Sequence, residues 1–481
     1  MARLSLYLPP LAGDYSGVCS TLFGLNCLVI IVDANCCTRN YVEYDEPRWA
    51  RRRKTAFSAQ LRTLEAVMGD DARIIDQACE AVEELSPACV AIIGSPVPAI
   101  MGMDLAGMAM EVESRTGVPS LGLPTTGFET YERGVSLALD ALIERFCGAG
   151  VRGTGDATRL RVNVLGLSPH DFADEADMGR VRSWLAEAGI DVAFCPDGAY
   201  TLGDVAAAAG ADASLVVAWS GLAAARRLQE EHGVPYVVGR PLCAVDAAEL
   251  ARELRAVAVG TAAASRGGAA TALLAGGAAC ASAAGDSCEE SVAQSGVGSG
   301  VAASGLVGAL SSLDAALSDA TPVLAGLLDE LPAVSVIPGP LPEAGEACEP
   351  APLLIVGEQA WANAVRDHAR GLRAGRAASV PAAPARPVVV ASLFAMDDAL
   401  MEPGDVRLAD EAALQDFART HPGFAWIGDP LLARIPELGA TAHFAVPHEA
   451  LSSTLYERER AVFSGEGLLP ALEGFIAELW G

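Results

Sequence analysis

Lysine is almost absent from this chain: the only one is Lys54, which follows three arginines. A phosphate-binding GxxxxGK[ST] loop requires a lysine after a glycine, so the sequence has no ATP site of this kind. A pyridoxal-phosphate Schiff base would also depend on Lys54, which stands in a charged stretch. The scarcity of lysine therefore argues against both cofactor chemistries.

Positive charge as a whole is scarce. The chain has 33 Lys and Arg against 61 Asp and Glu, a net charge of −28. Such a chain has little with which to neutralise phosphates, which argues against nucleic acid and anionic membranes as partners. We find no signal peptide and no convincing membrane span, and expect a cytoplasmic protein. In that setting, twelve cysteines indicate thiols or metal ligands rather than a disulfide framework.

Apolar, β-rich runs alternate with helical patterns along the chain, which is typical of parallel α/β units. Near the N-terminus, the apolar runs predict strands at Leu28–Val32, Cys89–Ile93 and Ser120–Leu123, with helices at Thr55–Met68 and Ile74–Glu84. Similar units open at RVNVLGL and PLLIVG, and an amphipathic helix ends the chain. We expect α/β domains at 1–150, 151–257 and 351–481, and an Ala/Gly/Ser-rich linker or insertion at 258–350.

Four cysteines surround the first predicted strand: Cys19, Cys27, Cys36 and Cys37. Thiols at the ends of one strand can meet at a sheet edge, where soft thiolates favour iron–sulfur clusters or zinc. Cys27 begins the strand and Cys89 begins the next one, so we expect both in the core. Cys36 is a weaker ligand candidate than Cys37, because neighbouring side chains on an extended chain point apart.

The order of local motifs is similar to that of the nitrogenase component 1 family. This family includes nitrogenase molybdenum–iron subunits, cofactor-assembly scaffolds and dark protochlorophyllide reductase subunits. The matching segments run through most of the chain: DANCCTRNY at 33–41, IGSPVPAIMGMDLAGMAMEVE at 93–113, LPTTGFETYERG at 123–134, and then RVNVLGL, PLLIVGE and VPHEALSS.

The resemblance implies three Rossmann-like parallel α/β domains. It also implies pairing of two such subunits, with an iron–sulfur cluster near the pairing surface, and electrons from a separate ATP-hydrolysing iron protein. Cys37 matches the family's loop cysteine, and Cys19 matches an upstream one. Where the family often has a third cysteine before proline, this chain has Ser95, so one subunit lacks ligands for a tetrathiolate cluster. A homodimer sharing one [4Fe–4S] cluster through Cys19 and Cys37 of each copy would supply them, as would a related partner subunit.

His448 falls near the place where the catalytic nitrogenase subunit has a cofactor histidine. The alternative is a histidine at a strand end, bonded to the backbone. No match stands out for that subunit's cofactor cysteine, and Cys243 is only a vague candidate. The sequence therefore does not decide whether there is a second metallocofactor. The DEPRW segment, Asp45–Trp49, is expected to be either a helix start or the lip of a substrate cavity or docking surface.

Three functions remain possible at this point. The first is an oxidoreductase subunit that takes electrons through the intersubunit cluster and reduces an unidentified small molecule in an enclosed cavity. The second is a non-catalytic scaffold on which a metallocluster is built or carried. The third is a binding protein that kept only the fold. The sequence favours the first, and its catalytic residues stay unknown.

Overall fold

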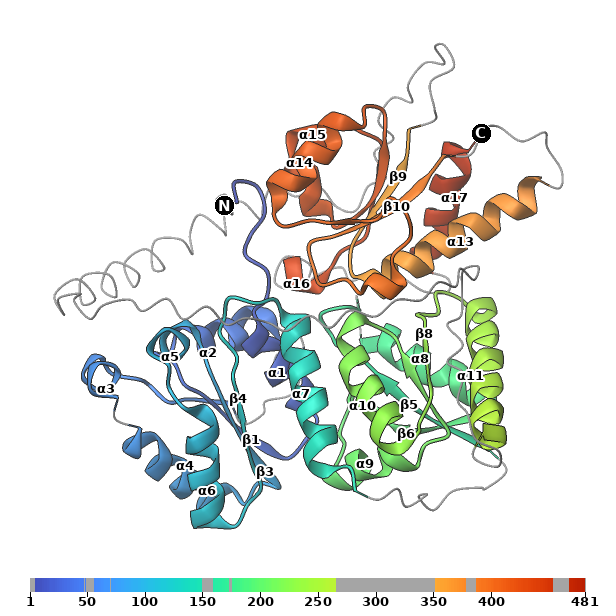
Figure 1. The fold of residues 1–481 in the computed structure, drawn as a ribbon. Coiled ribbons are helices and arrows are strands. Elements are labelled where there is room, and N and C mark those ends of the chain that lie inside the picture. Colours follow the sequence, from blue (N-terminus) through green and yellow to red (C-terminus); the bar gives the residue numbers. More distant parts are fainter. Residues whose placement is uncertain are drawn as a thin grey trace, which may run out of the picture. The chain divides into compact units, whose positions relative to one another are not determined.

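The computed structural model describes residues 5–46, 48, 56–69, 71–148, 159–172, 175–264, 351–377, 386–452 and 467–480. It contains three parallel β-sheets, each formed by its own stretch of the chain (Figure 1). The predicted fold class, three Rossmann-like α/β domains, is confirmed. Most of the predicted linker, as well as Lys54, lies outside the described residues. Among those residues, no helix combines the length and the apolar character that crossing a membrane requires.

The first sheet has the strand order β2-β1-β3-β4. Its strands are β1 (Cys27–Ile31), β2 (Ala56–Ser58), β3 (Cys89–Ile93) and β4 (Ser120–Leu123). The helices around it are α1 (Asp14–Leu22), α2 (Cys36–Asn40), the π-helix η1 (Tyr41–Asp45), α3 (Thr63–Met68), α4 (Ala72–Leu85), α5 (Pro96–Met101), α6 (Leu105–Thr116) and α7 (Tyr131–Phe146). The single helix predicted over Thr55–Met68 is therefore wrong in its first part, where β2 pairs with the edge of β1.

Strand β1 is buried on both faces of its sheet. Cys27, Val29 and Ile31 belong to one apolar cluster, while Leu28 and Ile30 belong to another. This division follows from the alternation of side chains along a strand. It also explains why the strand reads as a continuous apolar run, as parallel strands do.

Helices α1 and α7 approach each other unusually closely on one face of this sheet. A Cβ atom on Gly17 would lie 1.9 Å from the Tyr131 carbonyl oxygen, and one on Gly134 would lie 1.8 Å from the Asp14 carbonyl oxygen. Only glycine fits at either position, so this contact depends on two residues without side chains.

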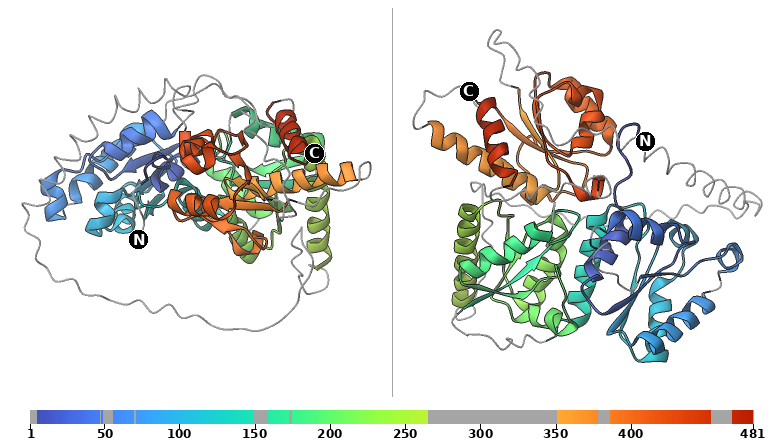
Figure 2. Two further views of the ribbon diagram at one scale, coloured as in Figure 1. Left: turned by 90° about the horizontal axis from the view of Figure 1, so that it is seen from above. Right: turned by 180° about the vertical axis from the view of Figure 1, so that it is seen from behind.

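The second sheet has the order β6-β5-β7-β8 and the third has β11-β10-β9-β12-β13. Elements of the second are β5 (Leu160–Leu165), α8 (Glu175–Glu187), β6 (Ile190–Phe194), α9 (Leu202–Ala207), η2 (Ala208–Gly210), β7 (Ala213–Val216), η3 (Trp219–Gly221), α10 (Leu222–His232), β8 (Tyr236–Val238) and α11 (Ala244–Ala264). Those of the third are β9 (Leu353–Val356), α13 (Gln359–Ala377), β10 (Val388–Ser392), η4 (Asp398–Leu400), β11 (Val406–Arg407), α14 (Glu411–Thr420), β12 (Ala425–Gly428), η5 (Pro430–Arg434), α15 (Pro436–Gly439), β13 (His443–Ala445), α16 (Glu449–Ser452) and α17 (Leu469–Leu479). Helices α13 and α17 pack against each other beside the third sheet, where they can be followed in orange and red from two further sides (Figure 2).

Three buried acidic side chains link elements that surround different sheets. Glu132 on α7 accepts a hydrogen bond from the backbone N–H of Ala395 at 2.9 Å. Glu358, after β9, accepts one from the N–H of Trp219 at 2.8 Å. The hydroxyl of Tyr131 donates to Asp171. Each link satisfies a buried polar group that would otherwise be costly to desolvate.

Candidate functional site

The first candidate site lies on the loop that follows β1. Asp33 directly follows the apolar run of this strand and is fully buried. Its carboxylate accepts hydrogen bonds from the N–H and hydroxyl of Thr38, at 2.8 and 3.1 Å, and from the hydroxyl of Ser58 at 2.6 Å. Asp33 thereby fixes the start of α2, which carries the two adjacent cysteines.

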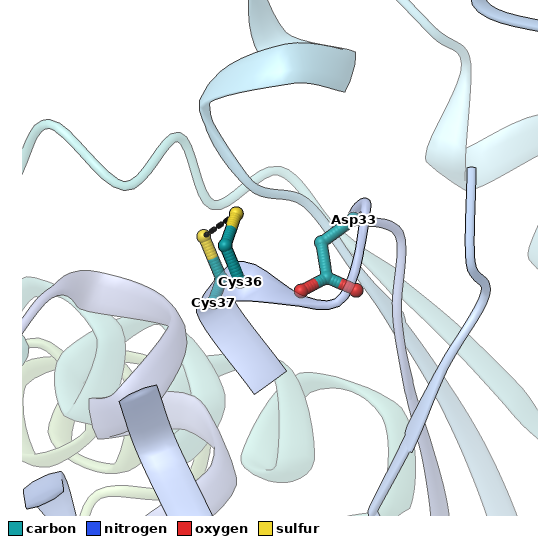
Figure 3. Close-up of side chains that lie close together, drawn as sticks. All are labelled: Asp33, Cys36 and Cys37. Atoms are coloured by element: carbon teal, nitrogen blue, oxygen red, sulfur yellow. Dashed lines mark hydrogen bonds between the residues drawn. The ribbon is translucent and has the colours of Figure 1, made fainter. Parts of the chain in front are cut away.

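The sulfur atoms of Cys36 and Cys37 lie 3.9 Å apart on the first turn of α2 (Figure 3). Their ligand atoms and those of Asp33 all lie within 4.8 Å of one another. The expectation that neighbouring side chains diverge here is wrong, because the loop turns into a helix immediately before Cys36. Cys36 is exposed, whereas Cys37 is buried.

The pKa values of the two thiols are shifted in opposite directions. A hydrogen bond from Cys37 lowers the pKa of the Cys36 thiol to about 7, although partial burial acts against it. The same hydrogen bond, followed by burial, raises the pKa of Cys37. The exposed sulfur therefore loses its proton more readily than the buried one, and the thiolate is the form in which a thiol binds metals.

The other predicted ligands, Cys19 and Ser95, are both buried. Cys19 is 2% exposed within α1 and is not part of the Asp33, Cys36 and Cys37 donor group. Burial, followed by the charge of Glu46, raises the pKa of its thiol well above the ordinary value. Ser95 is buried and its hydroxyl donates to the Val32 carbonyl at 2.8 Å. Cys27 and Cys89 are buried in neighbouring strands, as the sequence predicts.

Pro47 and Trp49 of the DEPRW segment lie outside the described residues, so the helix-start interpretation stays a prediction. Asp45 ends the π-helix η1. Glu46 and Arg48 form a buried ion pair at 2.7 Å, and Arg48 also donates to the Ser20 carbonyl at 2.7 Å. Burial alone would raise the pKa of Glu46, but the guanidinium of Arg48 outweighs it and the pKa is lowered. These charged side chains brace the region behind the cysteine loop instead of lining a surface.

A second candidate site is a cavity at the carboxyl ends of the third sheet's strands, where parallel α/β sheets usually bind ligands. The cavity volume is about 30 Å³, which holds about two waters at ~15 Å³ each. It is small and charged, unlike the enclosed apolar cavity that the oxidoreductase hypothesis expects. Its lining consists of Asp171, Arg240, Val356, Gly357, Trp361, Leu393, Phe394, Asp429, Leu432, Val446, Pro447, His448 and Leu451.

His448 lines this cavity, and only 12% of its side chain is exposed. The ring stacks on Phe394 with centroids 4.7 Å apart, and its Nε2 lies 3.8 Å from an oxygen of Asp171. Burial, followed by the charge of Arg240, lowers the pKa of His448 to about 3, so the ring is neutral at pH 7. The backbone N–H of His448 donates to Asp429 at 2.7 Å. A neutral imidazole is the form that ligates metals.

Arg240 provides positive charge in the cavity. It is 6% exposed, and its guanidinium carbon lies 3.7 Å from the centre of the Phe172 ring. Burial lowers its pKa, while Asp171 and Glu358 act in the opposite direction. No cysteine is among the lining residues, and Cys243 lies elsewhere, beside Asp246 and His368.

Sequence reasoning missed Arg240, Asp171, Glu358 and Asp429. A shared signal was available for three of them: Arg240, Glu358 and Asp429 each stand one or two positions after a strand of a parallel sheet. Asp33 occupies the corresponding position after β1. Because the carboxyl ends of parallel strands gather at one edge, charged residues at those positions are candidates for a site.

The sequence model of one protein family, the nitrogenase component 1 type oxidoreductases, matches residues 14–274, more than half of the chain. The chain belongs to this family. The curated relatives include nitrogenase iron-molybdenum cofactor biosynthesis proteins NifE. The protein from Bradyrhizobium diazoefficiens is 24% identical over 42% of this chain and 36% of its own length. The protein from Rhizobium meliloti is 26% identical over 43% of this chain and 43% of its own length. The protein from Rhodobacter capsulatus is 29% identical over 39% of this chain and 38% of its own length.

The match thus spans about two fifths of the length of these relatives. The family fold extends further than this sequence similarity. The solved structure of nitrogenase Cp1 at pH 6.5 superposes on this chain with a TM-score of 0.58 and 12% identity. The superposition covers all of this chain and 94% of the nitrogenase Cp1 chain. The structure of nitrogenase Cp1 at pH 5 superposes with a TM-score of 0.53 and 14% identity. These likenesses concern the fold, which this chain shares with component 1 proteins.

Proposed function

We propose that this protein is a scaffold on which a metal–sulfur cluster is assembled or carried, acting as one subunit of a component 1-type pair. The cluster is its cargo. The observation that carries the proposal is the adjacent pair of thiols on α2, one exposed and one buried, with sulfurs 3.9 Å apart. A ligand at the surface can take up and release a cluster, whereas a permanent cofactor is usually enclosed.

The NifE relatives favour this function over the catalytic one, because they are named as cofactor biosynthesis proteins. The family's oxidoreductase character keeps reduction of a small molecule as the competing function.

The donor set fits a cluster that is shared by two chains. Cys36 and Cys37 would supply two sulfur ligands from one subunit once Cys37 loses its proton to the cluster, and a tetrathiolate [4Fe–4S] cluster needs four. A second copy, or a related component 1 subunit, would supply the others across the contact. Cys19 remains a predicted ligand, and it would have to become accessible when the subunits pair. An ATP-hydrolysing iron protein remains the proposed electron donor.

Anaerobic purification, followed by counting of iron and sulfide and by EPR, tests the assignment of Cys37. We expect Cys37→Ser to lose at least half of the bound iron, because a serine hydroxyl is a poor ligand for such clusters. The matched control is Cys79→Ser, a half-buried cysteine on α4 far from the thiol pair in sequence. Full iron content in Cys37→Ser would remove the site from the proposal.

A second experiment separates scaffold from enzyme. The iron-loaded protein is mixed with a cluster-free component 1 acceptor, and iron is followed into the acceptor. In parallel, the loaded protein is incubated with iron protein, ATP and candidate substrates. Transfer without turnover supports the scaffold, and repeated turnover without transfer establishes the oxidoreductase instead.

A further inference from the structure

A second group of metal-binding side chains lies outside both candidate sites. The ligand atoms of Cys243, Asp246 and His368 all lie within 4.8 Å of one another. Cys243 directly precedes α11, Asp246 lies in its first turn, and His368 belongs to α13. We propose that these three side chains bind a single divalent zinc-type ion. The proposal does not depend on the function proposed above.

The local structure of α11 brings two of the donors together. Cys243 immediately precedes the helix, and its carbonyl accepts the N–H of Ala247 at 3.0 Å. Residues three positions apart lie on the same side of a helix, so the thiol of Cys243 and the carboxylate of Asp246 face one region. Asp246 also accepts the N–H of Leu242 at 3.1 Å, which holds its side chain at the helix start.

The third donor is oriented by a carboxylate on a neighbouring helix. Nε2 of His368 lies 2.9 Å from an oxygen of Glu473 on α17. When Nε2–H donates to this carboxylate, Nδ1 carries the lone pair and can bind a metal. A carboxylate behind the histidine is the usual outer partner in zinc sites, where it fixes the ring and raises its basicity.

The donor types and charges favour a borderline-soft cation. Sulfur, oxygen and nitrogen donors from Cys, Asp and His are the ligands that zinc prefers, and three protein ligands leave one position for water or a fourth ligand. The arginines nearest to His368 on α13 are engaged elsewhere: Arg366 pairs with Asp405 at 2.8 Å and Arg370 with Glu402 at 2.6 Å. Neither of these ion pairs involves Asp246.

The spacing is close to what a tetrahedral ion requires. Metal–ligand distances of about 2.0–2.3 Å place neighbouring ligand atoms ~3.3–3.8 Å apart. The ligand atoms lie up to 4.8 Å apart. They would have to approach one another by about 1 Å to bind the ion, which side-chain rotation can supply. All three residues are half-buried, so an ion can reach them from solvent.

Cobalt(II) is the probe for this site, because a thiolate bound to cobalt gives a charge-transfer absorption in the near ultraviolet. The full-length chain is used with Cys36→Ser and Cys37→Ser, which removes the other donor group. We expect one equivalent of cobalt with this band, displaced by zinc, and a rise in melting temperature with zinc because the ion binds only the folded site.

Variants assign the ligands. Cys243→Ser should abolish the band, while Glu473→Gln should keep it but weaken binding about 10–100-fold. His368→Gln should weaken binding with the thiolate band retained, and it serves as a second variant if Cys243→Ser does not fold. Cys79→Ser is the matched control and should leave the spectrum unchanged. The proposal fails if the band survives Cys243→Ser, or if cobalt binds the parent without any thiolate band.

Discussion

Single buried charges determine how the region behind the cysteine loop responds to pH. Asp45 accepts hydrogen bonds from the Ser16 hydroxyl at 2.6 Å and from the Asn40 amide at 3.1 Å. Burial outweighs these bonds and raises the pKa of Asp45 from 3.8 to about 6. The folded protein therefore favours the protonated carboxyl, and the stability gained from it is complete below pH 3.8 and disappears as the pH rises through 6.

Asp45→Asn should remove this pH dependence. A shift of this size corresponds to about 3 kcal/mol at 1.36 kcal/mol per pH unit. We expect the variant to be more stable than the parent at about pH 7.5, with a much smaller difference at about pH 4. Urea unfolding at both pH values measures it. If variant and parent differed in free energy of unfolding by the same amount at both pH values, burial of the ionised Asp45 carboxylate would not destabilise the protein.

At the scale of helices and strands, the close contact of α1 and α7 positions the elements around the thiol pair. Gly134→Ala would place a methyl carbon 1.8 Å from the carbonyl oxygen of Asp14. Because backbone must move to accept it, we expect a loss of about 1–3 kcal/mol or more in the free energy of unfolding. Thermal or urea unfolding measures this loss.

Gly371→Ala is the control for that substitution. Gly371 is exposed in the interior of α13, and an added Cβ there meets nothing within 4 Å. Alanine should therefore stabilise this helix by up to ~1 kcal/mol. Equal effects of the two substitutions would mean that helix propensity, rather than the α1–α7 contact, controls the response.

The elements also show what sequence patterns can and cannot predict. Long apolar runs such as Leu28–Val32 and Cys89–Ile93 indicated strands β1 and β3, since burial on both faces leaves a continuous pattern. Strand β2 (Ala56–Ser58) was missed, because three residues at a sheet edge adopt strand conformation through pairing with β1 rather than through their own preference.

At the scale of the whole molecule, Glu358 connects elements of the second and third sheets. Its carboxylate accepts the N–H groups of Trp219, Ala360 and Trp361 at 2.8, 3.0 and 2.9 Å. Glu358→Ala would remove the acceptor for all three. At about 1–3 kcal/mol for each buried donor left unsatisfied, we expect a loss of several kcal/mol.

The same substitution should reduce cooperativity, because one of the bonds crosses from one sheet's elements to the other's. Calorimetry should then show a broadened or divided transition. Glu358→Gln retains an acceptor oxygen and should behave closer to the parent. A sharp single transition in Glu358→Ala, with unchanged midpoint, would contradict a linking role.

The sequence by itself determined the repeated parallel α/β units and the family resemblance, and it pointed to the loop around Cys37 as a candidate site. These depend on local patterns: alternating burial along strands, helical periodicity and the position of a loop after a strand. The tertiary structure decided which distant side chains meet. It placed the sulfurs of Cys36 and Cys37 side by side, left Cys19 outside their donor group, gathered Arg240 with His448, and brought Cys243 to His368. Such encounters depend on how helices and sheets pack over long sequence separations, which no local pattern encodes.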